Sequence, residues 1–195
     1  MRKITIFFIF LLFQTTYISA DNLNEIKRIV VGNKDAKITI ITYESLTCSH
    51  CADFHINIYP ELKKNYIDTG IAKIEFRHFP LDVAALNASK ISQCKNDGGL
   101  EILESLYYNQ PKWIKGKTIE EININLKKFL KSQGFDLDFD SCINNKNIED
   151  FVLNDRIEGV KKFKVNATPT IIINGKKFEK SLNYKNLKKT LEKLI

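Results

Sequence analysis

Alternating apolar and polar positions, or clusters of β-branched residues, predict β-strands in four parts of the chain. Strands are expected at residues 26–31, 38–43, 72–79 and 170–173. The last forms a hairpin with residues 177–179 across the turn dipeptide Asn174-Gly175. Between residues 83 and 160 the pattern gives no convincing strand.

Apolar positions three or four residues apart predict helices elsewhere in the chain. One helix begins at Cys48, runs to about Tyr66 and is expected to kink at Pro60. Its apolar positions share one face: Cys51, Phe54, Ile58 and Leu62. Further helices are expected at residues 83–96, 99–108, 119–132, 138–144 and 147–163, and a C-terminal helix carries Leu187, Leu191 and Leu194 on one face.

The order of elements is two strands, a helix, a strand, a block of helices, two strands and a helix. The outer parts are expected to form one mixed sheet flanked by helices, which is the α/β class. We therefore assign residues 21–80 and 161–195 to the sheet domain and residues 81–160 to an all-helical insertion.

The first twenty residues have the three-part pattern of a secretory signal peptide. Arg2 and Lys3 precede a mainly apolar stretch at residues 4–13, and Ala20 suits the position before a cleavage site. The stretch is short for a membrane span, which needs about 20 residues. We predict that residues 1–20 form a cleavable signal peptide, with an uncleaved membrane anchor as the alternative.

The formal net charge is +7, and lysine supplies most of it in a scattered pattern. Such an excess, without a compact Arg-rich run, is typical of a solvated surface, so nucleic-acid binding is not expected. Hydrophobic residues make up 44% of the chain, which is enough for a buried core and excludes wholesale disorder.

Four cysteines carry the candidate chemistry, and in an exported protein disulfides persist. The simplest pairing joins Cys48 to Cys51 and Cys94 to Cys142. Cys48 begins a predicted helix, where unpaired N–H groups and the positive end of the helix dipole favour a thiolate, and His50 adds to this effect. Cys51 falls on the buried face one turn later. An exposed attacking sulfur and a sheltered resolving sulfur suit thiol–disulfide exchange.

A stabilised Cys48 thiolate stabilises the reduced protein, which makes the Cys48–Cys51 disulfide a stronger oxidant. The sequence therefore predicts a disulfide donor rather than a reductant. Two other interpretations of the pair are open. A zinc site would need two more ligands, and a purely structural disulfide would close too short a loop to stabilise the fold much.

The stretch "NATPT" at residues 166–170 is a second marker, because Pro169 precedes a β-branched strand. A proline peptide bond can be cis at modest cost, and a cis bond would turn the backbone of Thr168 towards an incoming peptide. From spacing alone, an ordinary trans proline at the start of a strand is equally compatible.

Four motifs, SLTCSHCADFH, EFRHFPLD, YYNQPKW and VNATPTIIINGKKF, resemble the DsbA-like thiol:disulfide oxidoreductases of the bacterial periplasm. The resemblance covers about residues 27–195 and implies a thioredoxin fold with a helical insertion. It implies that Cys48 is the nucleophile, that Cys51 resolves the mixed disulfide and that Pro169 is cis. We assign His50 to the catalytic set and Ser49, Thr168 and Pro169 to substrate binding. Relatives often have proline at the position of Ser49. Some relatives have valine at the position of Thr168, whereas isomerase-type members have threonine there, as this chain does.

The resemblance also implies that the partners are reduced secreted or periplasmic client proteins and that a quinone-linked, DsbB-like membrane protein reoxidises the chain. No cofactor and no metal are expected, and the protein is expected to be a periplasmic monomer. The alternatives are a disulfide isomerase or reductase of the same fold, a non-catalytic peptide-binding chaperone, and a form anchored to the outer face of the inner membrane.

Cys94 and Cys142 each follow an apolar residue of the same predicted helix face by three positions. We interpret them as a structural disulfide between two inserted helices, which resembles a second pair in some DsbA-like proteins. A regulatory disulfide and two free core thiols are the alternatives. Glu44 is a candidate proton carrier for Cys51, and His55 is interpreted mainly as a packing or surface residue.

Overall fold

The structure is a computed structural model that describes residues 25–195, so the predicted signal peptide lies outside the described residues. Its five strands are β1 (Ile29–Gly32), β2 (Ile38–Glu44), β3 (Ala72–His78), β4 (Thr170–Ile173) and β5 (Lys176–Lys177). They form one sheet in the order β1-β3-β2-β4-β5, in which only the β2–β3 pair is parallel. The predicted mixed sheet is therefore confirmed.

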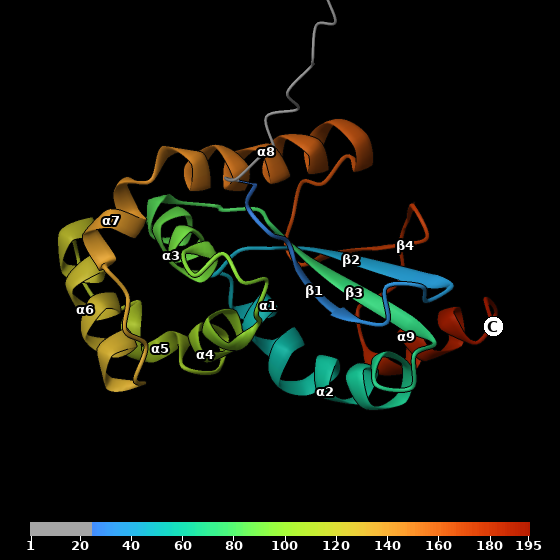
Figure 1. Cartoon of the computed structure of the whole chain (residues 1–195). Coiled ribbons are helices and arrows are strands. Elements are labelled where there is room, and N and C mark those ends of the chain that lie inside the picture. The colour runs from blue at the N-terminus through green and yellow to red at the C-terminus, as the bar shows by residue number, and fades with distance from the viewer. Residues whose placement is uncertain (1–24) are drawn as a thin grey trace, which may run out of the picture.

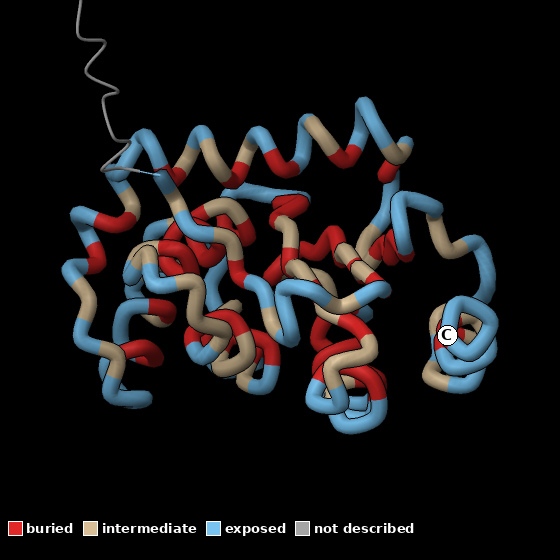
Figure 2. Tube along the Cα trace, turned by 45° about the vertical axis from the view of Figure 1, so that its right-hand side comes forward, coloured by how far each residue is buried: buried red, intermediate tan, exposed pale blue. Residues whose placement is uncertain are grey.

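Helices cover both faces of the sheet, as Figure 1 shows. The long helix α8 (Lys146–Phe163) crosses one face, and the run that begins with α1 packs with α9 (Tyr184–Leu191) on the other. Tyr43, Phe79, Val165 and Ile172 form a small core on the α8 side. The larger core lies on the other face and continues into the insertion, so buried positions follow the inner sides of the helices in Figure 2.

The helix after Cys48 is continuous but not uniformly α-helical. It consists of α1 (Ser49–Asp53), a π-helical turn (Phe54–Ile58), α2 (Tyr59–Leu62) and a second π-helical turn (Lys63–Ile67). The first π-helical turn ends just before Pro60, whose ring removes the N–H that would continue the α-helical ladder. The predicted apolar face is confirmed, because Cys51, Phe54, Ile58 and Leu62 are all buried.

The insertion is a cluster of helices at one end of the sheet (Figure 1). It contains α3 (Val83–Gln93), α4 (Glu101–Tyr108), α5 (Gln110–Trp113), α6 (Ile119–Ser132) and α7 (Phe139–Asn144). Side chains cap several of these helices; for example, the hydroxyl of Thr118 accepts the N–H of Glu121 at the start of α6. The short helix α5 was not predicted, and the expected boundary at residue 160 falls within α8.

Helix α8 is held on the sheet by Asp155, whose side chain is fully buried. Its Oδ1 accepts bonds from Arg28 at 2.6 Å and Arg77 at 3.2 Å, and its Oδ2 accepts the backbone N–H of His78 at 3.1 Å. Close approach of helix and sheet depends on Gly159, because a Cβ there would lie 2.8 Å from the ring of Tyr43.

Two details of the C-terminal part correct the sequence prediction. Strand β5 lies at Lys176–Lys177 rather than at residues 177–179, because Asn174 and Gly175 both have positive φ and form a tight two-residue turn. Leu187 and Leu191 are buried as predicted, but Leu194 lies beyond the end of α9 and is 43% exposed. Within residues 25–195, no helix is long and apolar enough to cross a membrane.

Candidate active site

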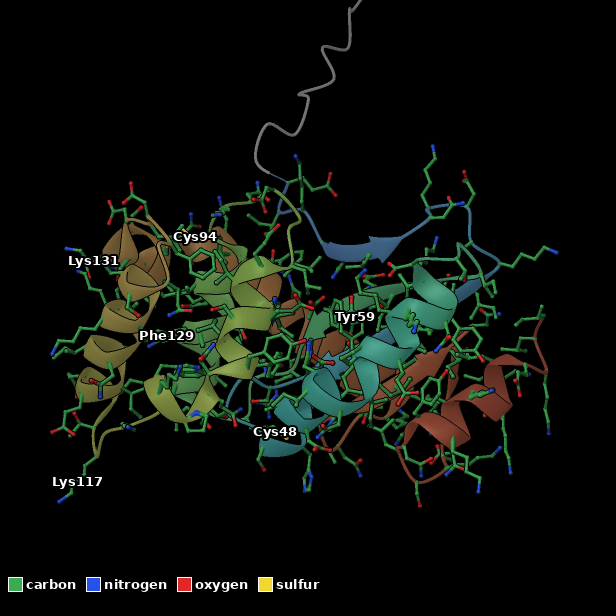
Figure 3. All side chains as sticks on the ribbon, turned by 90° about the horizontal axis from the view of Figure 1, so that it is seen from below. Cys48, Tyr59, Cys94, Lys117, Phe129 and Lys131 are labelled. Atoms are coloured by element: carbon green, nitrogen blue, oxygen red, sulfur yellow. A yellow bond between two sulfur atoms is a disulfide. The ribbon has the colours of Figure 1, made fainter. Side chains whose placement is uncertain are left out.

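Cys48 lies between the end of β2 and the start of α1. It is the N-cap residue, with extended backbone angles (φ −81°, ψ 119°), and its carbonyl oxygen accepts the N–H groups of Cys51 and Ala52. The side chain is partly exposed, and the intervening Ser49 and His50 are exposed. Figure 3 shows Cys48 at the tip of its helix. The predicted placement of this sulfur at a helix N-terminus is thus observed.

Cys51 lies one turn further on and is completely buried in the main core. Both cysteines are free thiols in this structure. The Cys51 thiol donates a hydrogen bond to the Cys48 sulfur, and its own sulfur accepts the backbone N–H of Ser45. The two sulfurs are therefore neighbours with different access to solvent, as the sequence predicted.

These contacts lower the pKa of Cys48 to about 5. The hydrogen bond from Cys51 is the largest cause, and it outweighs the opposing effect of partial burial. A hydrogen bond from the Thr168 side chain and the backbone N–H groups of Cys51 and His50 act in the same direction. His50 thus contributes through its backbone amide.

Burial has the opposite effect on the resolving sulfur. It raises the pKa of Cys51 far above that of an ordinary thiol, and the hydrogen bond to Cys48 and the charge of Glu44 add to the rise. At neutral pH the reduced pair therefore consists of a Cys48 thiolate and a Cys51 thiol. The thiolate is the nucleophilic form, so only the accessible sulfur is activated for attack.

A loop from the other end of the chain completes the site. The peptide bond between Thr168 and Pro169 is cis, as the resemblance implied. The carbonyl oxygen of Thr168 lies 3.3 Å from the Cys48 sulfur, and the side chain of Thr168 is partly buried. The structure thus brings together Cys48, Cys51, Thr168 and Pro169, with Ser49 and His50 at the exposed rim.

Sequence reasoning missed the role of Gln110, which lies in the unpredicted helix α5. Its buried side-chain amide donates to the carbonyl oxygens of Leu46 at 2.8 Å and Cys48 at 3.1 Å. The insertion thereby holds the backbone on both sides of Thr47. The motif "YYNQPKW" marked this segment, but nothing in its pattern indicated which side chain would reach the site.

Glu44 and His55 form a buried pair beneath the cysteines. Nε2 of His55 lies 2.8 Å from Oε2 of Glu44, and the two side chains are 0% and 3% exposed. The sequence suggested that Glu44 carries a proton and that His55 is mainly a packing or surface residue. The structure shows that His55 is a core residue bonded to that carboxylate.

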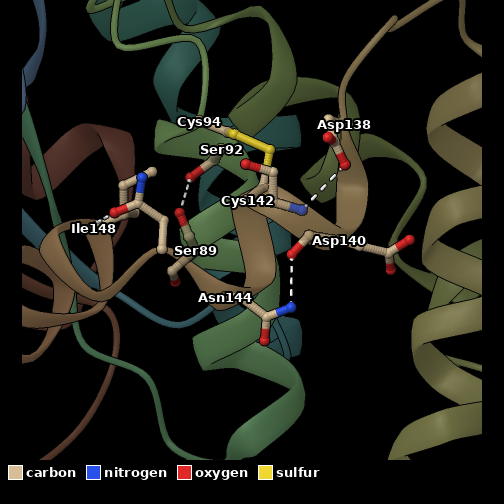
Figure 4. Close-up of a disulfide and its surroundings, with 10 residues drawn as sticks. Ser89, Ser92, Cys94, Asp138, Asp140, Cys142, Asn144 and Ile148 are labelled. Atoms are coloured by element: carbon tan, nitrogen blue, oxygen red, sulfur yellow. Dashed lines mark hydrogen bonds between the residues drawn. A yellow bond between two sulfur atoms is a disulfide. The ribbon is translucent and has the colours of Figure 1, made fainter.

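Cys94 and Cys142 form a disulfide that joins the end of α3 to α7, with a Cα–Cα separation of 5.5 Å. Figure 4 shows the bond between the two helices, beside the bond from Ser92 to the carbonyl oxygen of Ser89. Because these sulfurs are bonded to each other, they cannot join Cys48 and Cys51 in a zinc site. Within residues 25–195 no group of three or more potential ligands is placed to hold a metal.

The fold and the paired cysteines beside a cis proline define a thioredoxin-fold protein. The profile of the thioredoxin family matches residues 24–193. The crystal structure of Wolbachia pipientis alpha-DsbA1 is 30% identical, with a TM-score of 0.76 over 86% of this chain and 90% of that one. Oxidised BdbD from Bacillus subtilis is 25% identical, with a TM-score of 0.72 over 86% and 92% of the two chains.

The putative protein-disulfide oxidoreductase of Rickettsia bellii (strain RML369-C) is 30% identical over 148 residues, which are 75% of this chain and 56% of that protein. The chain thus spans little more than half the length of this relative. This chain belongs to the thioredoxin family and, within it, to the DsbA-like proteins.

Proposed function

We propose that this protein is an exported thiol:disulfide oxidoreductase that donates its Cys48–Cys51 disulfide to reduced client proteins. The observation that carries the proposal is the unequal environment of the two sulfurs. Cys48 is accessible, stabilised as a thiolate and adjacent to a cis proline, whereas Cys51 is buried and protonated. The names of its relatives, which include disulfide bond formation protein D of Bacillus subtilis (strain 168), support the same activity.

The exchange proceeds in two steps. A client thiolate attacks Cys48, the Cys48–Cys51 bond breaks with its electron pair passing to Cys51, and a mixed disulfide forms. A second client thiolate then attacks the client sulfur and expels Cys48. The client loses two electrons and two protons. This protein gains the two electrons and one proton and ends as a Cys48 thiolate with a Cys51 thiol, and the other proton passes to solvent. Because Cys48 is a good leaving group at a pKa of about 5, the second step favours release of the oxidised client.

The backbone beside Pro169 is proposed to bind the client. The carbonyl oxygen of Thr168 lies 3.3 Å from the reacting sulfur, where an extended client segment can meet it. Ser49 is exposed next to Cys48 and is proposed to contact the client from the other side. The catalytic set is then Cys48 and Cys51, with His50 supporting the thiolate.

Equilibration with reduced and oxidised glutathione tests the direction of electron flow. An oxidant should show a reduction potential well above the value of about −270 mV that is typical of thioredoxin. Cys48→Ser should abolish oxidation of a reduced test protein, whereas Cys142→Ser, far from the site, should retain it. A potential at or below that of thioredoxin would contradict the oxidase assignment.

Thr168 supports a second candidate, a disulfide isomerase, because isomerase-type relatives resemble this chain at that position. Refolding of a scrambled-disulfide substrate separates the two functions. An oxidase accelerates disulfide formation in a reduced substrate but rearranges wrong pairs slowly. A chaperone without redox activity would instead retain its effect in a Cys48→Ser, Cys51→Ser double variant.

Export and reoxidation are part of the proposal. The sequence pattern of residues 1–20 supports a cleavable signal peptide and a periplasmic location, and a DsbB-like membrane protein would regenerate the disulfide. N-terminal sequencing of the protein from a periplasmic extract should begin at Asp21. Detection of residues 1–20 in a membrane fraction would support the anchored form instead.

A further inference from the structure

Lysine is scattered over the whole chain, but the net charge is not. Residues 176–195 contain seven lysines and two glutamates, which gives a net charge of +5. Residues 25–175 contain 21 basic and 20 acidic side chains, which gives a net charge of +1. The basic side chains of residues 25–175 are thus almost exactly matched in number by acidic ones, and nearly all of the net positive charge lies in the C-terminal segment.

The seven lysines lie on two neighbouring elements. Strand β5 and the loop after it carry three of them, and α9 with the turn that follows carries four. Within residues 25–195, Lys188 alone among the seven has an ion pair, to Glu192 at 3.8 Å. The other six define a surface that we call the basic face: Lys176, Lys177, Lys180, Lys185, Lys189 and Lys193. All six are exposed except Lys177, which is half-buried.

An apolar groove lies within the basic face. It has a volume of about 330 Å³ and is formed by β5, the residues that flank it and the end of α9. Ile173, Phe178 and Leu194 supply apolar atoms to its lining. Among the described residues that line it, four are lysines of the basic face and one, Glu179, is acidic. Leu194 is 43% exposed and the adjacent Ile195 is 69% exposed, so large aliphatic side chains meet solvent among the lysines.

This combination is typical of a surface that binds a lipid bilayer from one side. Such surfaces join exposed aliphatic side chains to a set of basic residues. A lysine stem can lie along apolar atoms while its ammonium group reaches a phosphate, and this contact needs no fixed geometry. A bilayer with anionic lipids offers phosphates and an apolar layer beneath them, so it meets both requirements together.

Other occupants fit the basic face less well. A second copy of the chain would bring the same charge of +5 and would be repelled. Nucleic acid is commonly bound by arginine and by exposed aromatic rings, but residues 176–195 contain no arginine and their two aromatic residues, Phe178 and Tyr184, are half-buried. An acidic protein segment would match the charge, but flexible lysines on two elements do not define one geometry for a peptide.

We propose that the basic face binds the surface of an anionic phospholipid bilayer, with its lysines at the lipid phosphates and Leu194 in the headgroup layer. The inference goes beyond the exchange reaction and does not depend on it. Its occupant is the lipid surface itself rather than a membrane protein.

The active site stays accessible in this arrangement. Asn174 in the groove exchanges two hydrogen bonds with Thr39 near the start of β2, at 2.8 and 2.9 Å. Cys48 follows the opposite end of β2, and the strand from Thr39 to Glu44 is about 17 Å long. Figure 1 likewise shows α9 at the end of the sheet away from the insertion. A protein bound through the basic face therefore keeps its reacting sulfur away from the bilayer and open to clients.

Sedimentation with lipid vesicles tests the proposal. The chain without residues 1–20 is used, because the apolar stretch at residues 4–13 would bind lipid by itself and residues 25–195 contain the whole sheet and both cores. It should bind vesicles of phosphatidylcholine with roughly one third phosphatidylglycerol and not vesicles of phosphatidylcholine alone. Raising the salt from about 0.05 M to about 0.5 M should weaken the binding, because salt screens the attraction.

A triple variant, Lys185→Gln with Lys189→Gln and Lys193→Gln, should lower the partition coefficient at least about tenfold. Each lysine near an anionic bilayer contributes roughly a fivefold factor.

The matched control is Lys117→Gln with Lys128→Gln and Lys131→Gln. These lysines are exposed on the insertion and have no ion pair within residues 25–195, and Figure 3 shows Lys117 and Lys131 at the far end of the molecule from α9. The control removes the same charge and should bind as the wild type does.

Leu194→Ser tests the apolar contact and should weaken the binding about threefold or more. A variant that binds as the wild type does would contradict the entry of Leu194 into the headgroup layer. The rate at which glutathione reduces the Cys48–Cys51 disulfide should be unchanged in every variant, which confirms that each one is folded.

Three further results would overturn the proposal. The first is a wild-type chain that does not bind the anionic vesicles. The second is an equal loss of binding in the two triple variants, which would reduce the effect to overall charge. The third is binding to polyglutamate but not to vesicles, which would assign the basic face to an acidic protein segment instead.

Discussion

The Cys48 sulfur lies 3.3 Å from the carbonyl oxygen of Thr168, although 120 residues separate the two in sequence. This carbonyl lies just before β4, which pairs with the central strand β2 that leads to Cys48. Two adjacent strands, β2 and β4, thus position the reacting sulfur and the backbone that is proposed to bind the client.

The first prediction concerns the charge of Cys48. In the reduced protein, the ultraviolet absorbance of the thiolate should titrate with a midpoint at about pH 5. Because the folded pKa is lower than the ordinary value of 9.0, the thiolate stabilises the folded state. This contribution is complete above the unfolded pKa and is lost as pH falls through about 5. Reduced Cys48→Ala should lack it in denaturant unfolding, and a midpoint near 9 would contradict the assignment.

Thr168 tunes the same titration. Its hydroxyl is buried and has no other hydrogen-bond partner among the described residues, so it is available to the Cys48 thiolate. Thr168→Val should raise the pKa of Cys48 and make the disulfide less oxidising, measured by thiolate absorbance and glutathione equilibration. Thr190→Val, on α9, is the control. An unchanged titration in Thr168→Val would show that the hydroxyl does not reach the sulfur.

The disulfide between Cys94 and Cys142 should stabilise the insertion. It closes a loop with a sequence separation of 48, for which the chain-entropy estimate is about 4 kcal/mol. Replacing both residues by alanine should lower the free energy of unfolding by roughly 2–4 kcal/mol, measured with urea. If stability and exchange activity both stay at the wild-type values, neither a structural nor a regulatory role holds.

Gly159 permits the close packing of α8 on the sheet. A methyl group at this position would lie 2.8 Å from Cε1 of Tyr43, so Gly159→Ala should force the helix outwards. Overpacking of this kind costs about 1–3 kcal/mol. Thermal melting measures the loss, and Val160→Ala, at the exposed neighbouring position, should change the melting temperature little.

Asp155 is the buried side chain that joins α8 to β3 and to Arg28, just before β1. Its replacement by alanine would remove one of the three carboxylates that pair with Arg77 and would leave the buried N–H of His78 without a partner. The expected cost is about 1–3 kcal/mol in denaturant unfolding. Asp150→Ala on the same helix removes an exposed ion pair and should cost less than about 1 kcal/mol. Equal losses in both variants would contradict this interpretation of Asp155.

Local patterns predicted most of the elements and the reactive pair. The spacing of Cys51, Phe54, Ile58 and Leu62 alone specified the buried face of the helix, because helical periodicity is a local property. The position of Cys48 at the helix start likewise identified the sulfur that would be activated. Strand β5 and Leu194 were misplaced by one or a few residues, since turn geometry decides where short elements end.

Contacts between distant segments could not be predicted in this way. The pattern around residue 44 did not specify which face of β2 carries Glu44, and nothing near His55 indicated that Tyr107 of the insertion would stack on it. Gln110 reaches the backbone of Cys48 only because α5 folds back against the active-site loop.

The sequence by itself thus determined the chemistry that depends on neighbours along the chain: an accessible cysteine at a helix N-terminus, a buried cysteine one turn later, and a proline at the start of a late strand. The tertiary structure decided the rest. The hydrogen bonds that lower the pKa of Cys48, the cis bond beside it and the buried Glu44–His55 pair arise where β2, β4 and the insertion converge. Such effects depend on distances and burial in three dimensions, which periodicity in one dimension does not encode.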